Sequence, residues 1–321
     1  AFFDEPYADS SAIAYFAMTK ALKNKIKCVL CGDGGDENFA GYTSRYLMNR
    51  FEDNIRQKIP LMIREKILAP LAKVYPRKDN LPRPLRLKHF LSNLSLPQEQ
   101  AYFRDMSFYF QQEIKKILYT PDTIRAIGNY DAFDVLGKHF AEVSGADPVT
   151  KTQYVDIKTY MTEDILVKVD RMSMDNSLEV RVPLLDHKLV EFALTLPLEL
   201  RIRGNGKGQV RKYLLRKAAA PLLPQEFLER RKWGFGIPLA RWLKDPLRAL
   251  VCESLDAGAH DLAPYLDPAA IRRLVRDFYG GQEGRAAQVW LLLALRLWHD
   301  AARAAARKAE PALSGAGAPG A

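Results

Sequence analysis

Residues 25–37 read KIKCVLCGDGGDE, an apolar run followed at once by a glycine-rich acidic loop. An apolar run as short as Ile26–Leu30, followed closely by glycines, predicts a buried strand. Glycines after a strand let the backbone approach a ligand closely and adopt φ > 0. Ligands of open α/β sheets bind at the carboxyl ends of the strands. The stretch therefore predicts a strand that presents an acidic ligand-binding loop.

The segments around this strand predict helices. Apolar residues recur at helical spacing over 13–21, after a candidate N-cap at Asp9 or Ser10, and a second helix is expected over Gly41–Arg50. Helix, strand, loop and helix form one turn of a doubly wound α/β sheet, so we expect the other strands upstream. The chain lacks an initiator methionine and a signal peptide, and we expect it to be part of a longer protein.

The rest of the chain is expected to be predominantly helical. Residues 51–150 carry helical patterns broken by prolines. The other expected elements are an exposed basic linker at Arg77–Lys88, one long helix at Thr150–Asp175, an extended segment at Val180–Leu185, a helix capped by Asp186 and stopped by Pro197, a basic helix at Lys207–Ala220 and an apolar helix at Ala286–Arg303. We expect one domain over 1–305, comprising a nucleotide-core remnant (1–50), a helical insertion (51–150) and a helical catalytic part (151–305), before a disordered tail at 306–321.

Composition places the chain among ordinary globular proteins, with 48% hydrophobic and 27% charged residues. It lacks an apolar run of about 18 residues, the length that a spanning helix needs, so no membrane partner is expected. The net charge of +10 is spread over several segments, which favours a solvated surface over a nucleic-acid stripe. A nucleic-acid partner is therefore not expected, although a basic nucleic-acid-binding helical protein is the rival from another class.

Three cysteines are present: Cys28, Cys31 and Cys252. Cys28 and Cys31 have the spacing of half a zinc site, but a second half is missing. We interpret them as a core thiol in the strand and a loop thiol. So few cysteines, with no signal peptide, suggest the reducing cytoplasm.

The acidic loop is the first candidate for chemistry. Asp33, Asp36 and Glu37 place three carboxylates within five residues, which repel one another unless a cation lies between them. Mg²⁺ carried by a nucleotide polyphosphate is the usual cation, because it keeps waters and takes one or two protein carboxylates. The alternative is an acidic surface turn.

Two other segments carry candidate cations. Asp164, Lys168 and Arg171 share one face of the long predicted helix, where either cation could hold phosphates; the alternative is a self-satisfied ladder of ion pairs. Residues Glu229–Pro238 contain three consecutive cations and a Gly-aromatic-Gly-Ile-Pro loop. A lysine there could neutralise charge on a departing pyrophosphate, and a surface loop anchored by aromatic rings is the alternative.

These segments occur in an order that resembles the synthetase domain of glutamine-hydrolysing asparagine synthetases. The similarity runs from residue 1 to about residue 300. The chain also looks like the exosortase-associated amidotransferases of exopolysaccharide loci. The matching motifs are DEPYADSS at 4–11, GDGGDE at 32–37 with Gly41-Tyr42, DILVKVDR at 164–171, LEVRVPLLD at 178–186, and Lys232 with Gly234-Phe235.

The resemblance implies a fold, a cofactor set and site residues. It implies an adenine-nucleotide alpha-hydrolase-like fold of the ATP pyrophosphatase (PP-loop) type, with large helical additions. It implies ATP and Mg²⁺ as cofactors, while the family's nucleotide loop and glutaminase domain lie upstream of the matched segment. By position, the nucleotide would lie near Cys31, Gly32 and Gly34, Asp36 would bind Mg²⁺-pyrophosphate, Asp33 would orient substrates or accept a proton, Lys168 would hold phosphates, and Lys232 would stabilise adenylation.

The resemblance also implies a reaction. A substrate carboxylate, by family default aspartate, attacks the α-phosphorus of ATP, and ammonia channelled from glutamine then converts the acyl-adenylate to an amide. We expect this segment alone to be inactive, and a homodimer is a candidate assembly. An amidotransferase acting on a sugar acid in exopolysaccharide synthesis is the alternative within enzymes.

Overall fold

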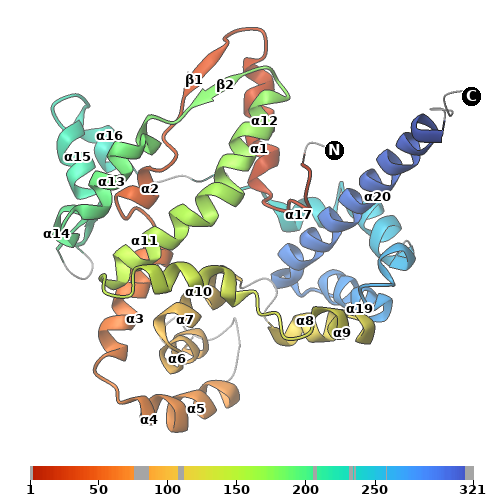
Figure 1. Ribbon diagram of the computed structural model, residues 1–321, viewed down its shortest axis with the longest axis horizontal. Coiled ribbons are helices and arrows are strands. Elements are labelled where there is room, and N and C mark those ends of the chain that lie inside the picture. The colour runs from red at the N-terminus through yellow and green to blue at the C-terminus, as the bar shows by residue number, and fades with distance from the viewer. Residues whose placement is uncertain are drawn as a thin grey trace, which may run out of the picture.

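The computed structural model describes residues 3–75, 87–107, 112–204, 208–230, 234, 236–257 and 259–314. The described chain is a mostly helical α/β structure with two small sheets (Figure 1). None of its described helices is both long and apolar enough to cross a membrane.

The N-terminal elements follow the predicted order of helix, strand, loop and helix. They are α1 (Ser11–Leu22), β1 (Cys28–Leu30), α2 (Gly35–Asn38), a π-helix (Thr43–Leu47) and α3 (Met48–Arg56). The helix expected over Gly41–Arg50 is thus a π-helical turn that continues into α3. Helix α1 packs against α12 (Leu166–Met174), so the first helix contacts a helix about 150 residues later in the sequence (Figure 1).

Strand β1 pairs in parallel with β2 (Glu179–Arg181), and the register sets Cys28 opposite Glu179 and Leu30 opposite Arg181. This pairing brings the GDGGDE loop, which follows β1, next to the motif LEVRVPLLD, which contains β2. The prediction of a buried strand is wrong: the side chain of Leu30 is 71% exposed and Cys28 is exposed rather than a core thiol. The reason is that β1 has β2 as its strand neighbour in a sheet of two, so the outward side chains are left uncovered.

Residues 51–150 form the expected run of helices. These are α3, α4 (Leu61–Ile63), a π-helix (Arg64–Leu68), α5 (Ala69–Val74), α6 (Lys88–Ser95), α7 (Gln98–Met106), α8 (Gln112–Leu118), α9 (Pro121–Ile127) and α10 (Phe133–Glu142). The rings of Tyr102 and Phe140 pack with Val155 in a small core that holds this part to α11 (Pro148–Lys158). The linker predicted at 77–88 lies outside the described residues except at its last two positions.

The long helix predicted over Thr150–Asp175 is broken. It consists of α11 (Pro148–Lys158), a π-helix (Met161–Ile165) and α12. The backbone leaves the helical region at Thr159, where φ is −127° and ψ −74°. Next to this break, the ring of Tyr160 lies 3.6 Å beneath the guanidinium of Arg45. A tertiary contact therefore interrupts a sequence that is locally helical.

After β2 the chain forms a 3₁₀ turn (Pro183–Leu185), α13 (His187–Thr195), α14 (Leu198–Arg201), β3 (Ile202–Arg203), β4 (Val210–Arg211) and α15 (Tyr213–Ala219). The predicted cap is confirmed, because the side chain of Asp186 accepts from the N–H groups of Lys188 and Leu189. The basic helix expected from Lys207 is wrong over its first part: Val210 and Arg211 pair with β3, and the helix begins at Tyr213.

The C-terminal elements are α16 (Gln225–Glu229), α17 (Leu239–Lys244), α18 (Arg248–Val251), a π-helix (Cys252–Ala257), two 3₁₀ turns (Ala259–Leu262, Glu283–Arg285), α19 (Pro268–Tyr279) and α20 (Ala286–Ser314). Ile271, Phe278 and Leu293 are fully buried in the core among these helices. Helix α20 runs past Arg303 into the predicted tail, while residues 315–321 lie outside the described residues.

Candidate active site

The acidic loop turns sharply between β1 and α2. Gly34 has φ = +84°, and a Cβ there would lie 2.3 Å from Cδ2 of Leu185. Glycine is therefore required both by the backbone conformation and by the close approach of Leu185. The side-chain amide of Asn38 donates to the carbonyl of Leu184 at 2.6 Å, so the loop is fastened to the segment that follows β2.

Asp36 forms an ion pair with a lysine that the sequence analysis did not select. The Nζ atom of Lys212 lies 3.1 Å from Oδ1 of Asp36. Lys212 has φ = +52°, the left-handed conformation that non-glycine residues rarely adopt, and its N–H donates to the carbonyl of Phe39 at 3.1 Å. The neighbouring Arg211 donates to the carbonyl of Gly41 at 2.6 Å. The residue that follows β4 thus places its ammonium group beside the acidic loop.

Cys31 and Asp33 lie at the start of the loop. The thiol of Cys31 donates to Oδ2 of Asp33 at 3.1 Å. Burial raises the pKa of Cys31 to about 12, so the group is a neutral donor at physiological pH rather than a thiolate. Gly32 is exposed, and the space where its Cβ would be is open. A ligand can therefore reach the backbone at the end of β1.

Glu37, the third carboxylate of the loop, is structural. It is 1% exposed, its Oε1 accepts from the hydroxyl of Tyr42 at 2.8 Å, and the side-chain amide of Gln153 donates to its carbonyl. Burial raises the pKa of Glu37. Tyr42 therefore holds the carboxylate, and Gln153 of α11 holds the main chain of Glu37. This leaves Asp33 and Asp36 as the acidic groups for a ligand.

Lys168 lies on α12 and pairs with the N-terminal segment. Its Nζ is 2.6 Å from Oδ2 of Asp9 and 2.8 Å from Oγ of Ser11. Burial alone would raise the pKa of Asp9, but Lys168 and Ser11 hold it below its ordinary value. Lys168 thus has long-range partners, which favours a positioned cation over the alternative of a self-satisfied helical ladder.

The other two residues predicted on that helix face, Arg171 and Asp164, also pair with the N-terminal segment. Arg171 forms an ion pair with Asp4, and the hydroxyl of Tyr7 donates to Oδ1 of Asp164 at 2.5 Å. Burial raises the pKa of Asp164. The motifs DEPYADSS and DILVKVDR therefore meet side by side.

Arg45 and Tyr160 connect the acidic loop with the contacts around Lys168. The guanidinium of Arg45 lies over the rings of Tyr160 and Tyr42, at 3.6 and 5.0 Å from their centroids. Burial raises the pKa of Tyr160 to about 12, and the charges of Asp164, Asp9 and Glu37 act in the same direction. The charges of the acidic loop and of the segment before α12 thus both act on Tyr160. No sequence signal marked Arg45 or Tyr160.

Comparison with known proteins agrees with this arrangement. Residues 1–300 match the asparagine synthase family. The chain belongs to that family. It is 33% identical over 305 residues to "Asparagine synthetase [glutamine-hydrolyzing] 1" of Bacillus subtilis, covering 93% of this chain and 44% of the relative. It is 30% identical over 301 residues to "Putative asparagine synthetase [glutamine-hydrolyzing]" of Mycobacterium tuberculosis, covering 93% and 43%. No solved structure matches.

A more distant relative is "Amidase chry2" of Gibberella zeae, which is 24% identical over 306 residues, covering 88% of this chain and 42% of the relative. The chain thus spans less than half the length of these asparagine synthase relatives. Enzymes of the family use ATP. The relatives named above as glutamine-hydrolysing asparagine synthetases are ligases.

The donor set of this asparagine synthase-family chain fits a metal ion that arrives with a nucleotide. Within the described ranges, no three His, Cys, Asp or Glu side chains are grouped to hold a metal ion. Magnesium typically takes one or two protein carboxylates together with substrate phosphates and waters. Asp36 therefore fits a magnesium-phosphate complex rather than a metal cage made by the protein alone.

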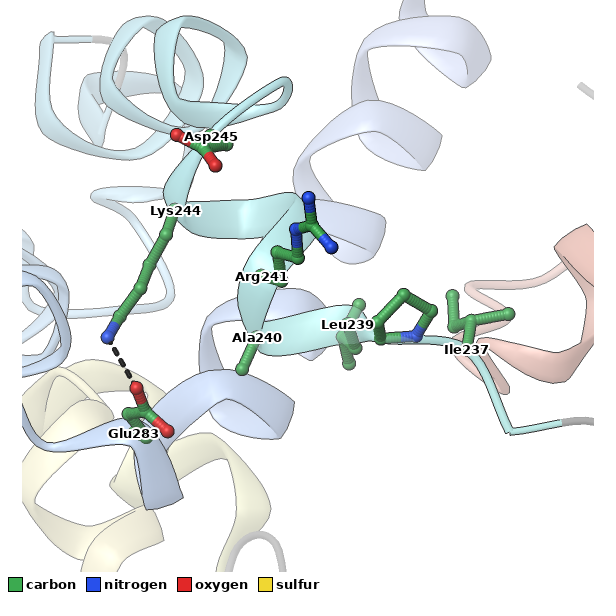
Figure 2. A pocket seen from close by; sticks show the side chains of 8 residues that line it. Ile237, Leu239, Ala240, Arg241, Lys244, Asp245 and Glu283 are labelled. Carbon is green, nitrogen blue, oxygen red and sulfur yellow. Dashed lines mark hydrogen bonds and ion pairs between the residues drawn. The ribbon is translucent and has the colours of Figure 1, made fainter.

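Lys232 and its aromatic neighbours Trp233 and Phe235 lie outside the described residues, so the role expected of Lys232 stays a prediction. An open, largely apolar pocket begins just after them, lined by residues 237–241 and by Lys244, Asp245 and Glu283 (Figure 2). Its polar contact is the ion pair between Lys244 and Glu283 at 2.7 Å. Because Asp33, Asp36 and Lys168 do not line this pocket, it is not the site built by the motifs.

Proposed function

We propose that this chain is the carboxylate-activating part of an enzyme that uses ATP to convert a carboxylate to an amide through an acyl-adenylate. Ammonia comes from glutamine, hydrolysed by a domain upstream of the segment. Aspartate is the substrate that the relatives' names favour, which makes asparagine synthesis the proposed reaction of the whole protein. Family membership supports the reaction class, and the geometry of the acidic loop supports the assignment of residues.

The observation that carries the proposal is the pairing of Asp36 with Lys212 at the end of β1. A carboxylate beside an ammonium group offers a metal-bound phosphate two complementary contacts: the carboxylate binds the metal, and the ammonium binds a phosphate oxygen. An acidic surface turn would have its carboxylates in solvent. Here the side chain of Asp36 is 17% exposed, and its cation comes from the residue that follows β4, far along the chain.

Each residue then has a defined task. Lys212 and Lys168 provide positive charge for the pyrophosphate that leaves when the carboxylate attacks, which is electrostatic stabilisation of the transition state. The backbone at Cys31 and Gly32 faces the nucleotide, and Asp33, held by the Cys31 thiol, orients the substrate or takes the proton of the incoming ammonia. Magnesium bound with the nucleotide would supply further positive charge at the phosphates. Lys232 is proposed as a third cation on the leaving group.

The proposed fold is a PP-loop nucleotide domain completed from upstream. Two observations support this fold: β1 and β2 form a short parallel pair, and the side chain of Leu30 on β1 is exposed. In a doubly wound sheet, strands are covered on both faces by helices. The additional strands and the family's nucleotide loop would cover this surface, and they would place ATP at the carboxyl end of β1.

The products of the reaction test this proposal. The full-length protein, supplied with ATP, magnesium and glutamine, is incubated with aspartate or with a sugar acid, and nucleotide and amide products are measured. We expect AMP, pyrophosphate and asparagine in equal amounts. ADP with phosphate would exclude adenylation, and an amide formed from the sugar acid but not from aspartate would favour the exopolysaccharide alternative.

A further inference from the structure

A second surface lies apart from the candidate active site, on the helical part between residues 51 and 106. Residues 61–74 form one continuous helical stretch made of α4, a π-helix and α5. In Figure 1, α4 and α5 form the lower edge of the molecule, on the far side of α6 and α7 from α11. This stretch carries a row of large apolar side chains on its outer face.

The apolar row is unusually exposed for a packed helix. Ile67 is 57% exposed and Val74 is 78% exposed, while Ile63 and Leu71 also lie in solvent. Positions 63, 67, 71 and 74 are three or four residues apart, so their side chains share one face of the helix. Met62 adds a further apolar side chain, 62% exposed, at the start of the stretch. Contiguous apolar surface of this kind marks an interaction site.

The helix cannot turn this row inward, because its other face is fixed. Ala72 is buried at 5% exposure, and α5 packs against α6. The guanidinium of Arg64 reaches the carbonyl of Leu96 at 3.5 Å, and Nζ of Lys88 reaches the carbonyl of Lys73 at 3.4 Å. The apolar row is therefore a permanent outer face of the folded protein.

Basic side chains border the row. Lys66 and Lys73 each precede a row residue and are seven positions apart, so both lie along the same flank; both are exposed. Between residues 61 and 74 there are three basic residues and one acidic residue, Glu65. The surface thus combines a row of apolar side chains with two exposed lysines on one flank.

We propose that the helix 61–74 docks the protein on the surface of an anionic lipid bilayer, with its apolar row in the headgroup–acyl boundary and its lysines at the phosphates. A basic amphipathic helix with exposed apolar residues is typical of such interfacial docking. The helix lies in the plane of the membrane and does not cross it, so the absence of a spanning helix among the described residues is compatible with it.

Two other partners, a second copy of this chain and a different protein, fit this surface less well. In an isologous pair of this chain, the same surface faces itself, so the lysine flanks of two copies would come together and repel. Protein interfaces are generally depleted in lysine, whereas anionic lipid attracts each lysine near its surface. The charge of the flank therefore favours a lipid surface over a second protein.

Vesicle binding tests the proposal independently of catalysis. Full-length protein is sedimented with vesicles of equal parts phosphatidylglycerol and phosphatidylcholine, and with vesicles of phosphatidylcholine alone. We expect binding to the mixed vesicles, weakened by salt and at least about tenfold weaker on the neutral ones. Absence of binding by the wild-type protein, or equal binding to both vesicles, would overturn the proposal.

Three variants locate the binding surface. Ile67→Asp combined with Val74→Asp removes two exposed apolar side chains and should reduce binding at least about tenfold, while Lys66→Gln combined with Lys73→Gln should reduce it several-fold. Leu222→Asp is the matched control, because Leu222 is 80% exposed elsewhere on the chain. Equal binding by all three would overturn the proposal. A doubled molecular mass in solution that Ile67→Asp returns to a single copy would instead assign the surface to a second chain.

Discussion

The ammonium of Lys212 lies 3.1 Å from a carboxylate oxygen of Asp36, and the backbone of Lys212 takes a left-handed conformation at that point. Such a conformation costs an ordinary residue about 1 kcal/mol or more. The surrounding contacts maintain it, among them the hydrogen bond from the N–H of Lys212 to Phe39. Strain of this kind at a charged pair is typical of functional sites, and it links the pairing of β3 with β4 to the chemistry of the acidic loop.

The space for this pair is made by Gly41. A Cβ at Gly41 would lie 1.9 Å from Oδ1 of Asp36 and 2.4 Å from Cε of Lys212. We expect Gly41→Ala to force the two side chains apart, to destabilise the protein by about 1–3 kcal/mol and to reduce pyrophosphate exchange at least about tenfold. Gly145→Ala is the control, since a Cβ there meets no atom within 4 Å. Equal behaviour of the two variants in urea unfolding and exchange would contradict this reading.

The pairing of Lys168 with Asp9 makes a prediction about pH. Burial opposes ionisation of Asp9, yet Lys168 and Ser11 lower its pKa below the ordinary 3.8. A lowered carboxyl pKa stabilises the fold above the unfolded value, and this stability is lost as pH falls through the folded value. We therefore expect Lys168→Met to be about 1–3 kcal/mol less stable than the wild type at neutral pH, with the difference shrinking below pH 3.8. A difference that is constant with pH, measured by urea unfolding, would show that Asp9 and Lys168 are not coupled.

Arg45 is predicted to be a major source of stability. Its Nη1 lies 3.3 Å from Oδ1 of Asp156, whose side chain is 1% exposed, and the hydroxyl of Tyr46 donates to the other carboxylate oxygen at 2.7 Å. Removing one partner of a buried pair leaves an uncompensated charge, so Arg45→Met should cost about 3–5 kcal/mol. Arg181→Met is the control, because its ion pair with Glu179 is exposed and should be worth less than about 1 kcal/mol. Comparable losses of stability in the two variants would refute the prediction.

Glu52 predicts a second pH effect, of opposite sign. It is 3% exposed, and burial followed by the charge of Asp105 raises its pKa from 4.5 to about 7. The folded state then holds a proton that the unfolded state has lost, so stability falls as pH rises between these values. We expect a loss of about 3 kcal/mol across this window, and Glu52→Gln should remove most of it. Thermal unfolding across the window provides the measurement, and an unchanged slope in the variant would show that another group is responsible.

The sequence predicted local structure well where one or two neighbouring residues decide it. The cap at Asp186 depends on its own side chain and the next two N–H groups, and the turn after β1 depends on Gly34. Both are encoded locally, so both could be found from residue types and spacing.

Features that depend on distant contacts were missed. The break before Tyr160 follows from its stacking under Arg45, and the role of Lys212 follows from the pairing of β3 with β4. Local periodicity contains neither fact, so both segments were predicted as continuous helix. The burial of β1 was wrong for a related reason: an apolar run shows that a strand has partners to pack against, but it does not show which part of the protein supplies them.

Isotope exchange between pyrophosphate and ATP, driven by the acceptor carboxylate in the full-length protein, tests the central claim most directly. We predict that Asp36→Asn and Lys212→Met each reduce the exchange rate by about a hundredfold or more, while Arg181→Met exchanges at the wild-type rate. If both site variants, folded as judged by their melting, exchanged at the rate of Arg181→Met, then the acidic loop and Lys212 would not form the pyrophosphate site.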